Sequence, residues 1–153
     1  YMAVMFLGSV SSFAENNIDK AVRFVNALEV SDLKTVKSLM AEEFVFEDPT
    51  FGVKHEGRDN VLKLYAGYIG DARNMHKSLT EGYESANTVV LHYSYYIEMN
   101  VAPKGQPKDY IPVMAKGSRV IDFTVDGKIS RHIDLADYAA IQKAVAARAA
   151  KEK

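Results

Sequence analysis

Apolar residues recur at two different spacings along the chain, and the spacing changes near Met75. Before Met75, apolar side chains recur every three or four residues, which predicts amphipathic helices over 17–28, 33–40 and 59–69. One short aromatic and β-branched run, 44–47, predicts a strand between the second and third of these helices. After Met75, runs rich in Val, Ile and Tyr predict strands over 76–83, 88–99, 110–125 and 128–135.

Local signals mark several ends of these elements. Asp48-Pro49 stops the short strand, because a residue before proline is held out of helical geometry and proline cannot donate to a ladder. Asp126-Gly127 is a strong hairpin signal between the last two predicted strands. The Ala-rich tail from Ala136 has helical propensity but few large apolar residues, so we expect it to be peripheral and frayed.

The order of the elements predicts the fold class. Helices gathered first and long strands afterwards indicate an α+β domain with helices on one face of a curved sheet, rather than alternating βαβ units. A strongly bent sheet covered by three helices makes a cone with an apolar interior. A pocket of that kind usually binds a small molecule.

Composition excludes several classes of function. The chain has 153 residues, a formal net charge of −1 and no cysteine. The length fits one domain, the charge gives no electrostatic footprint for nucleic acid, and the missing cysteines exclude disulfides and thiolate chemistry. Glycine-rich nucleotide fingerprints and the G-x-S-x-G elbow are absent from the sequence. The four histidines lack the close spacing of a helical metal pair, so no metal site and no cofactor is expected.

The first 14 residues have the pattern of an export signal. An uncharged apolar run over 2–10 is too short to span a bilayer, and Ser12 and Ala14 are small residues at the spacing of a cleavage site. This predicts a periplasmic or secreted protein without stable membrane insertion. The alternative is an apolar N-terminal helix that packs on the domain, which leaves a cytoplasmic location open. We therefore divide the chain into segments 1–14, 15–145 and a charged tail, 146–153.

The stretch 23–49, which carries Ala-Leu, Asp-Leu and the strand end Glu47-Asp48-Pro49, resembles the nuclear transport factor 2-like superfamily, and within it SnoaL-like and ketosteroid isomerase-like proteins. Gly127-Lys-Ile-Ser-Arg-His-Ile-Asp134 resembles the last strand of that family. The resemblance covers 17–145. It implies a cone-shaped fold in which three N-terminal helices pack on a strongly curved, mixed and mainly antiparallel sheet.

The resemblance implies acid/base chemistry at Asp48. In ketosteroid isomerases the Asp of Glu-Asp-Pro is the general base, which needs a carboxylate beside apolar walls. The two donors that hold the substrate oxygen in those enzymes fall on Phe24 and close to Ile121 in this chain. Without them we do not expect ketosteroid isomerase activity itself.

Two other branches of the superfamily direct attention to the last strand. Epoxide hydrolases of this fold use an Asp-Arg-Asp arrangement; Asp134 matches its last-strand member, and Glu98, Arg119 or Arg131 could substitute for the missing middle-strand pair. SnoaL-like cyclases depend on a late acid or base, for which Asp134 or His132 is the match.

The residue pattern also supports a structural interpretation of these same residues. Asp48 before proline is a common turn cap. If Ser130, His132 and Asp134 face the pocket, alternation along a strand turns Ile129, Arg131 and Ile133 outward, as in a dimer interface. Tyr95 and its neighbour on the same face, Tyr93, are usually core or interface residues.

Together these observations predict a homodimeric SnoaL-like domain that binds a small apolar molecule and acts as an isomerase, cyclase or hydrolase. Asp48, Asp134 and His132 are the catalytic candidates. The alternative is a non-catalytic, exported domain of the same fold that binds a ligand or a protein. The expected ligand-binding residues are Phe24, Phe46, Tyr65, Tyr95, Glu98 and Ile121.

Overall fold

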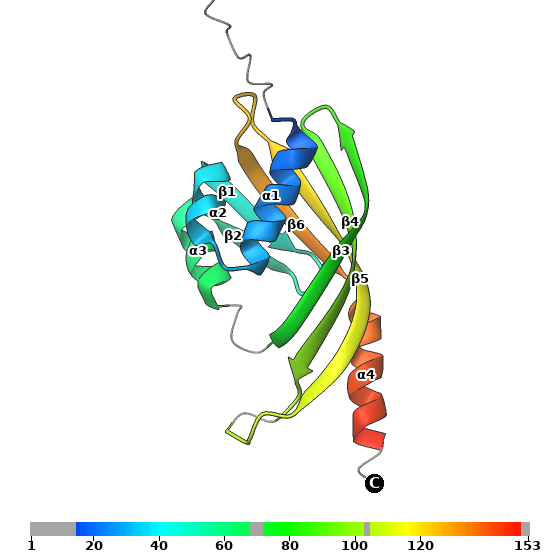
Figure 1. Cartoon of the computed structure of the whole chain (residues 1–153). Helices are drawn as coiled ribbons and strands as arrows, with labels where there is room; N and C mark the ends of the chain where they lie inside the picture. Colours follow the sequence, from blue (N-terminus) through cyan, green and yellow to red (C-terminus); the bar gives the residue numbers. More distant parts are fainter. Residues whose placement is uncertain (1–14, 68–71, 103–104, 151–153) are drawn as a thin grey trace, which may run out of the picture.

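A computed structural model describes residues 15–67, 72–102 and 105–150. The predicted export signal lies outside these residues and stays a prediction. Four helices and six strands make up the described part of the chain (Figure 1). Within it, no helix combines the length and the apolar character needed to cross a membrane.

The three predicted N-terminal helices are present. They are α1 (Asn17–Glu29), α2 (Leu33–Leu39) and α3 (Arg58–Gly67). Asn16 caps α1 by accepting a hydrogen bond from the Asp19 amide, and Asp32 caps α2 by accepting one from the Thr35 amide. The two caps fix the helix starts at Asn17 and Leu33, where the apolar spacing predicts them.

The C-terminal tail is a 13-residue helix, α4 (Tyr138–Ala150). None of its residues is buried, as expected for a peripheral element. It nevertheless packs through Ala140, Ile141 and Ala144 on a small cluster around Ile97 and Val113. Small alanine side chains allow this close approach to the sheet, so the tail contributes one wall of the domain.

The sheet is mixed and mainly antiparallel, and it is not closed. Its spatial order is β2-β1-β6-β5-β4-β3, and only the β1–β6 pair is parallel among the described strands. The strands are β1 (Met40–Asp48), β2 (Val53–Glu56), β3 (Ala72–Ser85), β4 (Thr88–Asn100), β5 (Tyr110–Phe123) and β6 (Ile129–Ala136). The predicted α+β architecture is confirmed, whereas the sequence pattern predicts no strand over the residues of β2.

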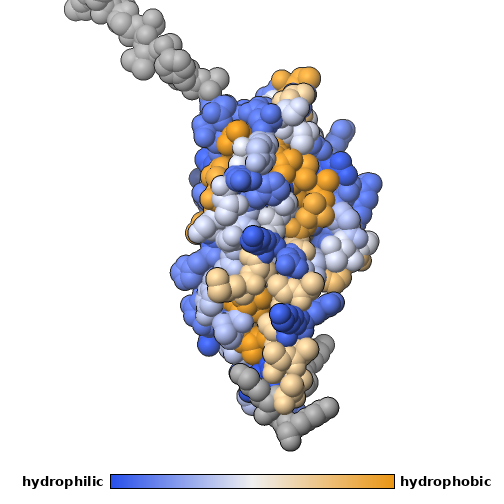
Figure 2. Space-filling model, turned by 90° about the vertical axis from the view of Figure 1, so that its right-hand side faces the viewer, coloured by the Kyte–Doolittle hydropathy of each residue, from blue (hydrophilic) through white to orange (hydrophobic). Residues whose placement is uncertain are grey.

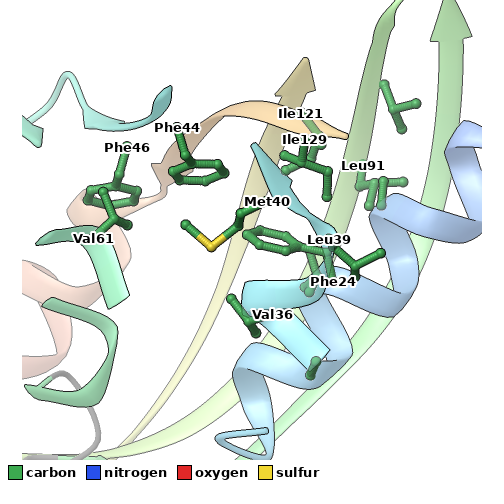
Figure 3. Packing of buried hydrophobic residues seen from close by; sticks show 14 of the residues in the cluster. Phe24, Val36, Leu39, Met40, Phe44, Phe46, Val61, Leu91, Ile121 and Ile129 are labelled. Carbon is green, nitrogen blue, oxygen red and sulfur yellow. The ribbon is translucent and has the colours of Figure 1, made fainter. Parts of the chain in front are cut away.

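Helices α1–α3 gather beside one half of the twisted sheet and α4 lies beside the other (Figure 1). Side chains fill the space between α1–α3 and the sheet (Figure 3). Phe24 and Phe44 lie with ring centroids 6.0 Å apart, and both are fully buried. The interior below the three helices is therefore a packed core, not the apolar hollow that the sequence predicted there.

Strand β6 does not alternate as a simple strand would. Ile129, expected to face outward, is fully buried in the core, and so is His132 three residues later. The pairing of β5 with β6 shifts register between Asp122 and Phe123, which inserts an extra residue in β6. The bulge brings both Ile129 and His132 to the inner face, so the expected orientation of Ile129 is wrong.

Candidate functional site

A pocket opens where β3, β4, β5 and the end of β6 extend beyond α1–α3 and meet α4; we call it the α4 pocket. Its volume is about 180 Å³. A cavity of roughly 150 Å³ holds benzene, so this space suits one ring or an acyclic molecule of similar size. It is lined by Met75, Lys77, Tyr93, Tyr95, Ile97, Met99, Gly117, Arg119, Asp134, Ala136, Tyr138 and Ile141.

Gly117 lines the pocket from β5. It pairs with Tyr93 on one neighbouring strand and with Ala136 on the other. A Cβ atom at this position would lie 3.3 Å from the carbonyl oxygen of Leu135 and 3.5 Å from the Tyr95 ring. The glycine thus lets the strands and the tyrosine approach closely while leaving the pocket open.

An ion pair between Arg119 and Asp134 forms part of the wall. These residues are directly opposite on β5 and β6, and both the Nε and the Nη2 groups of Arg119 donate to the Asp134 carboxylate at 3.2 Å. Two parallel bonds of this kind fix the plane of a carboxylate. Of the substitutes considered for the missing family arginine, Arg119 is the one that contacts Asp134, whereas Arg131 pairs with Glu47.

Lys77 reaches the pocket from β3, with a side chain that is only 10% exposed. Its ammonium group lies 3.2 Å from the carboxylate of Glu29, the last residue of α1. Burial, followed by the nearby charge of Arg119, lowers the pKa of Lys77 to about 8, against the opposing effect of Glu29. The lysine is therefore held in its charged form less firmly than a surface lysine.

Tyr93 brings a polar atom into the same region. Its residue is 5% exposed, and within the described part of the chain its hydroxyl group has no hydrogen-bond partner. Burial raises its pKa to about 12, so the hydroxyl remains protonated and can donate. A buried hydroxyl without a partner is costly, which makes it a candidate contact for a ligand.

Asp48 is buried, with 4% of its surface exposed, but it does not line the α4 pocket. One carboxylate oxygen accepts from the Thr50 amide, which is the turn cap considered from the sequence. The other accepts the hydroxyl of Tyr138 at 2.7 Å. Because Tyr138 lines the pocket, Asp48 is connected to it through this hydroxyl.

His132 lies deeper, in the aromatic core rather than on the pocket wall. Its Nδ1 atom and the Tyr65 hydroxyl are hydrogen-bonded at 2.8 Å, and the rings of Phe24 and Phe46 lie 5.5 and 5.4 Å away. Burial, reinforced by the charges of Arg119 and Lys77, lowers the pKa of His132 well below its usual value. The imidazole is neutral at physiological pH.

The structure separates the residues that the sequence grouped. Tyr95 and Asp134 line the pocket, whereas Phe24, Phe46, Tyr65 and Ile121 belong to the core. The Glu98 side chain is bound elsewhere, by the Arg73 guanidinium at 2.6 Å and the Asn74 amide at 3.0 Å.

Sequence reasoning did not select Lys77. No local motif marks this lysine as a site residue, because its partner Glu29 lies on a different element, far away in the chain. The sequence places Tyr93 on the same strand face as Tyr95, but only the structure shows that its buried hydroxyl has no hydrogen-bond partner among the described residues. In the described ranges, no group of three His, Asp or Glu residues is placed to hold a metal ion.

Comparison with known proteins identifies the family. The model of the SnoaL-like domain matches residues 21–132, so the chain belongs to the SnoaL-like domain family. This agrees with the resemblance carried by the Glu-Asp-Pro and last-strand motifs. No curated protein sequence matches the chain.

Solved structures share the fold at low sequence identity. A provisionally assigned SnoaL-like polyketide cyclase from Shewanella denitrificans has a TM-score of 0.75 and 17% identity, over 86% of this chain and 97% of that one. An epoxide hydrolase from M. tuberculosis has a TM-score of 0.66 and 19% identity, over 84% and 88%. A hypothetical protein with a ketosteroid isomerase-like fold from Catenulispora acidiphila, in complex with trimethylamine, has a TM-score of 0.67 and 16% identity, over 84% and 92%.

Proposed function

We propose that this chain binds a small, largely apolar molecule in the α4 pocket and catalyses a proton transfer on it, with Asp134 as the general acid/base. The observation that carries the proposal is the position of the Asp134 carboxylate. It lies on the wall of a pocket of ligand size, oriented by Arg119 and beside apolar residues of β4 and α4. Cyclases, isomerases and epoxide hydrolases among proteins of this fold support acid/base chemistry as the general class.

The two predicted carboxylates have different roles in this proposal. Asp134 faces the ligand, and Arg119 holds its oxygens in one plane. Asp48 acts indirectly, because it accepts a hydrogen bond from the Tyr138 hydroxyl and so fixes that side chain on the pocket wall. Asp48 is thus a positioning residue in the proposed mechanism, and His132 supports the core behind the pocket.

Hydrogen–deuterium exchange tests the proposal without knowledge of the natural substrate. Cyclohexanone and 2-oxobutanoate are incubated with the protein in D₂O, and loss of the proton signal next to the carbonyl group is followed by NMR. Positioned general bases contribute about 10²- to 10⁴-fold, so we expect exchange above the buffer rate and a loss of about 100-fold or more in Asp134→Asn.

Asp137→Asn is the matched control, since Asp137 caps α4 through the Ala140 amide and does not line the α4 pocket. This variant should retain exchange, and Asp48→Asn should show a smaller loss than Asp134→Asn. Exchange no faster than in buffer for the wild-type protein, or an unchanged rate in Asp134→Asn, contradicts the proposal.

A non-catalytic ligand-binding role is the second candidate. It is favoured by one observation: the oxygens of Asp48 and those of Asp134 all accept hydrogen bonds already. Binding of small ligands in the pocket without any exchange would support this alternative.

Homodimer formation and export remain proposals of the same kind. On the face shown in Figure 2, apolar surface occurs as separate patches between polar side chains. Sedimentation of the purified protein tests the dimer. Mass spectrometry of the protein recovered from its producing cell tests removal of residues 1–14.

A further inference from the structure

Two cationic groups and one carboxylate line the α4 pocket. Lys77 and Arg119 face it together with Asp134. Arg119 uses two of its nitrogens on both oxygens of Asp134, so the negative charge of that carboxylate is already matched. Lys77 has three ammonium protons, and among the described residues Glu29 is the carboxylate that pairs with it. The lining thus offers ammonium donors beyond the one that Glu29 accepts.

The charges that act on the buried neighbours differ across the pocket. Arg119 is the largest charge acting on Lys77, on Tyr93 and on His132, ahead of Glu29 for Lys77 and Tyr93. At His132, Arg119 and Lys77 both oppose protonation. At Tyr95 the order is reversed, with Asp134 ahead of Arg119, so the positive charge of Arg119 is felt mainly on the Lys77 and Tyr93 side of the pocket.

Tyr93 supplies an independent observation. Its hydroxyl is buried and lacks a partner within the described residues, and its residue also lines the pocket. Lys77 is paired with Tyr95 across β3 and β4, and Leu79 is paired with Tyr93, so Lys77 and Tyr93 are diagonal neighbours on these strands. Both residues line the pocket together with the apolar side chains of Ile97, Met99 and Ile141.

We infer that Lys77 and Tyr93 form a subsite for the carboxylate of a small acid with an apolar body. This inference rests on the proposed small-molecule pocket and names the class of its ligand. One carboxylate oxygen would accept a hydrogen bond from the Lys77 ammonium group, and the Tyr93 hydroxyl would donate a second hydrogen bond to the ligand. The bound anion would also offset part of the cost of burying the Lys77 ammonium group.

The test compares two probes of one shape that differ in charge, benzoate and benzamide. Their affinities for the full chain are measured at pH 7 by NMR titration, with toluene as an apolar reference. A hydrogen bond to a charged group contributes more than one between neutral groups, so benzoate should bind about tenfold or more tightly than benzamide. Its advantage should decline as pH rises through about 8, where Lys77 loses its proton beside Arg119, Glu29, Asp134 and the two tyrosines.

Variants assign the preference to the two residues. In Lys77→Met the preference for benzoate should disappear while benzamide and toluene bind as before. In Tyr93→Phe the benzoate affinity should fall by a few-fold, with toluene unaffected. Where Lys77→Met is unstable because Glu29 loses its cation, Lys77→Met combined with Glu29→Gln removes both charges and allows the same comparison.

Equal affinities for benzoate and benzamide overturn the inference, and so does a benzoate preference that persists in Lys77→Met. Binding of toluene and benzamide without a carboxylate preference leaves the proposed function intact while this subsite fails. Absence of binding by all three probes contradicts both.

Discussion

The buried neutral His132 predicts a specific loss of stability in acid. The unfolded chain takes up a proton on this histidine near its ordinary pKa of 6.5, whereas in the folded chain the pKa lies well below that value. The unfolded state therefore binds more protons below pH 6.5, and the free energy of unfolding falls as pH decreases until the folded pKa is reached. Above pH 6.5 this contribution is fully present.

The size of the effect follows from linkage. One proton taken up only by the unfolded state changes the free energy of unfolding by about 1.4 kcal/mol per pH unit. If His132 stays neutral in the folded chain down to pH 5, the loss between pH 7 and pH 5 is about 2 kcal/mol. That is a large fraction of a typical total of roughly 5–15 kcal/mol.

Urea unfolding between pH 5 and pH 8 measures the effect, and His132→Asn isolates it from the carboxylates that also titrate there. Asparagine keeps a hydrogen-bonding group close to the position of Nδ1 but carries no charge in this range. The variant should be less stable at pH 7, and its free energy of unfolding should fall less steeply with acid than that of the wild-type protein. His76→Asn, at an exposed position, should leave the slope unchanged. Equal slopes for wild type and His132→Asn would refute the reasoning.

Two further substitutions test the core and the link between α4 and β1. Tyr138→Phe removes the hydrogen-bond donor to buried Asp48, so it should lower the free energy of unfolding by about 1–3 kcal/mol and speed amide exchange in α4. Tyr83→Phe is the control, because it removes a solvent-exposed hydrogen bond to Glu81 and should have little effect. Similar small losses in both would show that Asp48 is solvated. Phe24→Ala should lower the free energy of unfolding by about 3–5 kcal/mol, because the ring is fully buried. Phe51→Ala, at a position that is 64% exposed, should lower it far less. Denaturant unfolding measures both losses.

The local pattern was sufficient for the long regular elements. The three- and four-residue spacing of apolar side chains over 17–28 and 33–40 predicted α1 and α2. The motif ending at Asp48 placed the chain in its superfamily. Strand β2 escaped prediction because four residues, half of them charged, form a strand only beside an existing edge. The burial of Ile129 was not predicted, because it depends on a bulge in β6 that arises from the register with β5.

The candidate site was predicted less completely. Asp134 and Tyr95 were expected and line the pocket, whereas Asp48 reaches it through Tyr138. Tyr138 belongs to a tail whose small side chains gave little reason to expect a pocket wall.

By itself the sequence determined the class of the fold, the order of its helices and strands and the family to which the chain belongs, because periodicity and short motifs are local properties. Only the tertiary structure decided where the empty space lies. Large aromatic rings fill the cone below α1–α3, and a glycine in β5 together with the docking of α4 leaves room at the other end. The charged groups there, Lys77, Arg119 and Asp134, come from three different strands. Cavities and electrostatic potentials are sums over such distant neighbours, and a local pattern does not contain them.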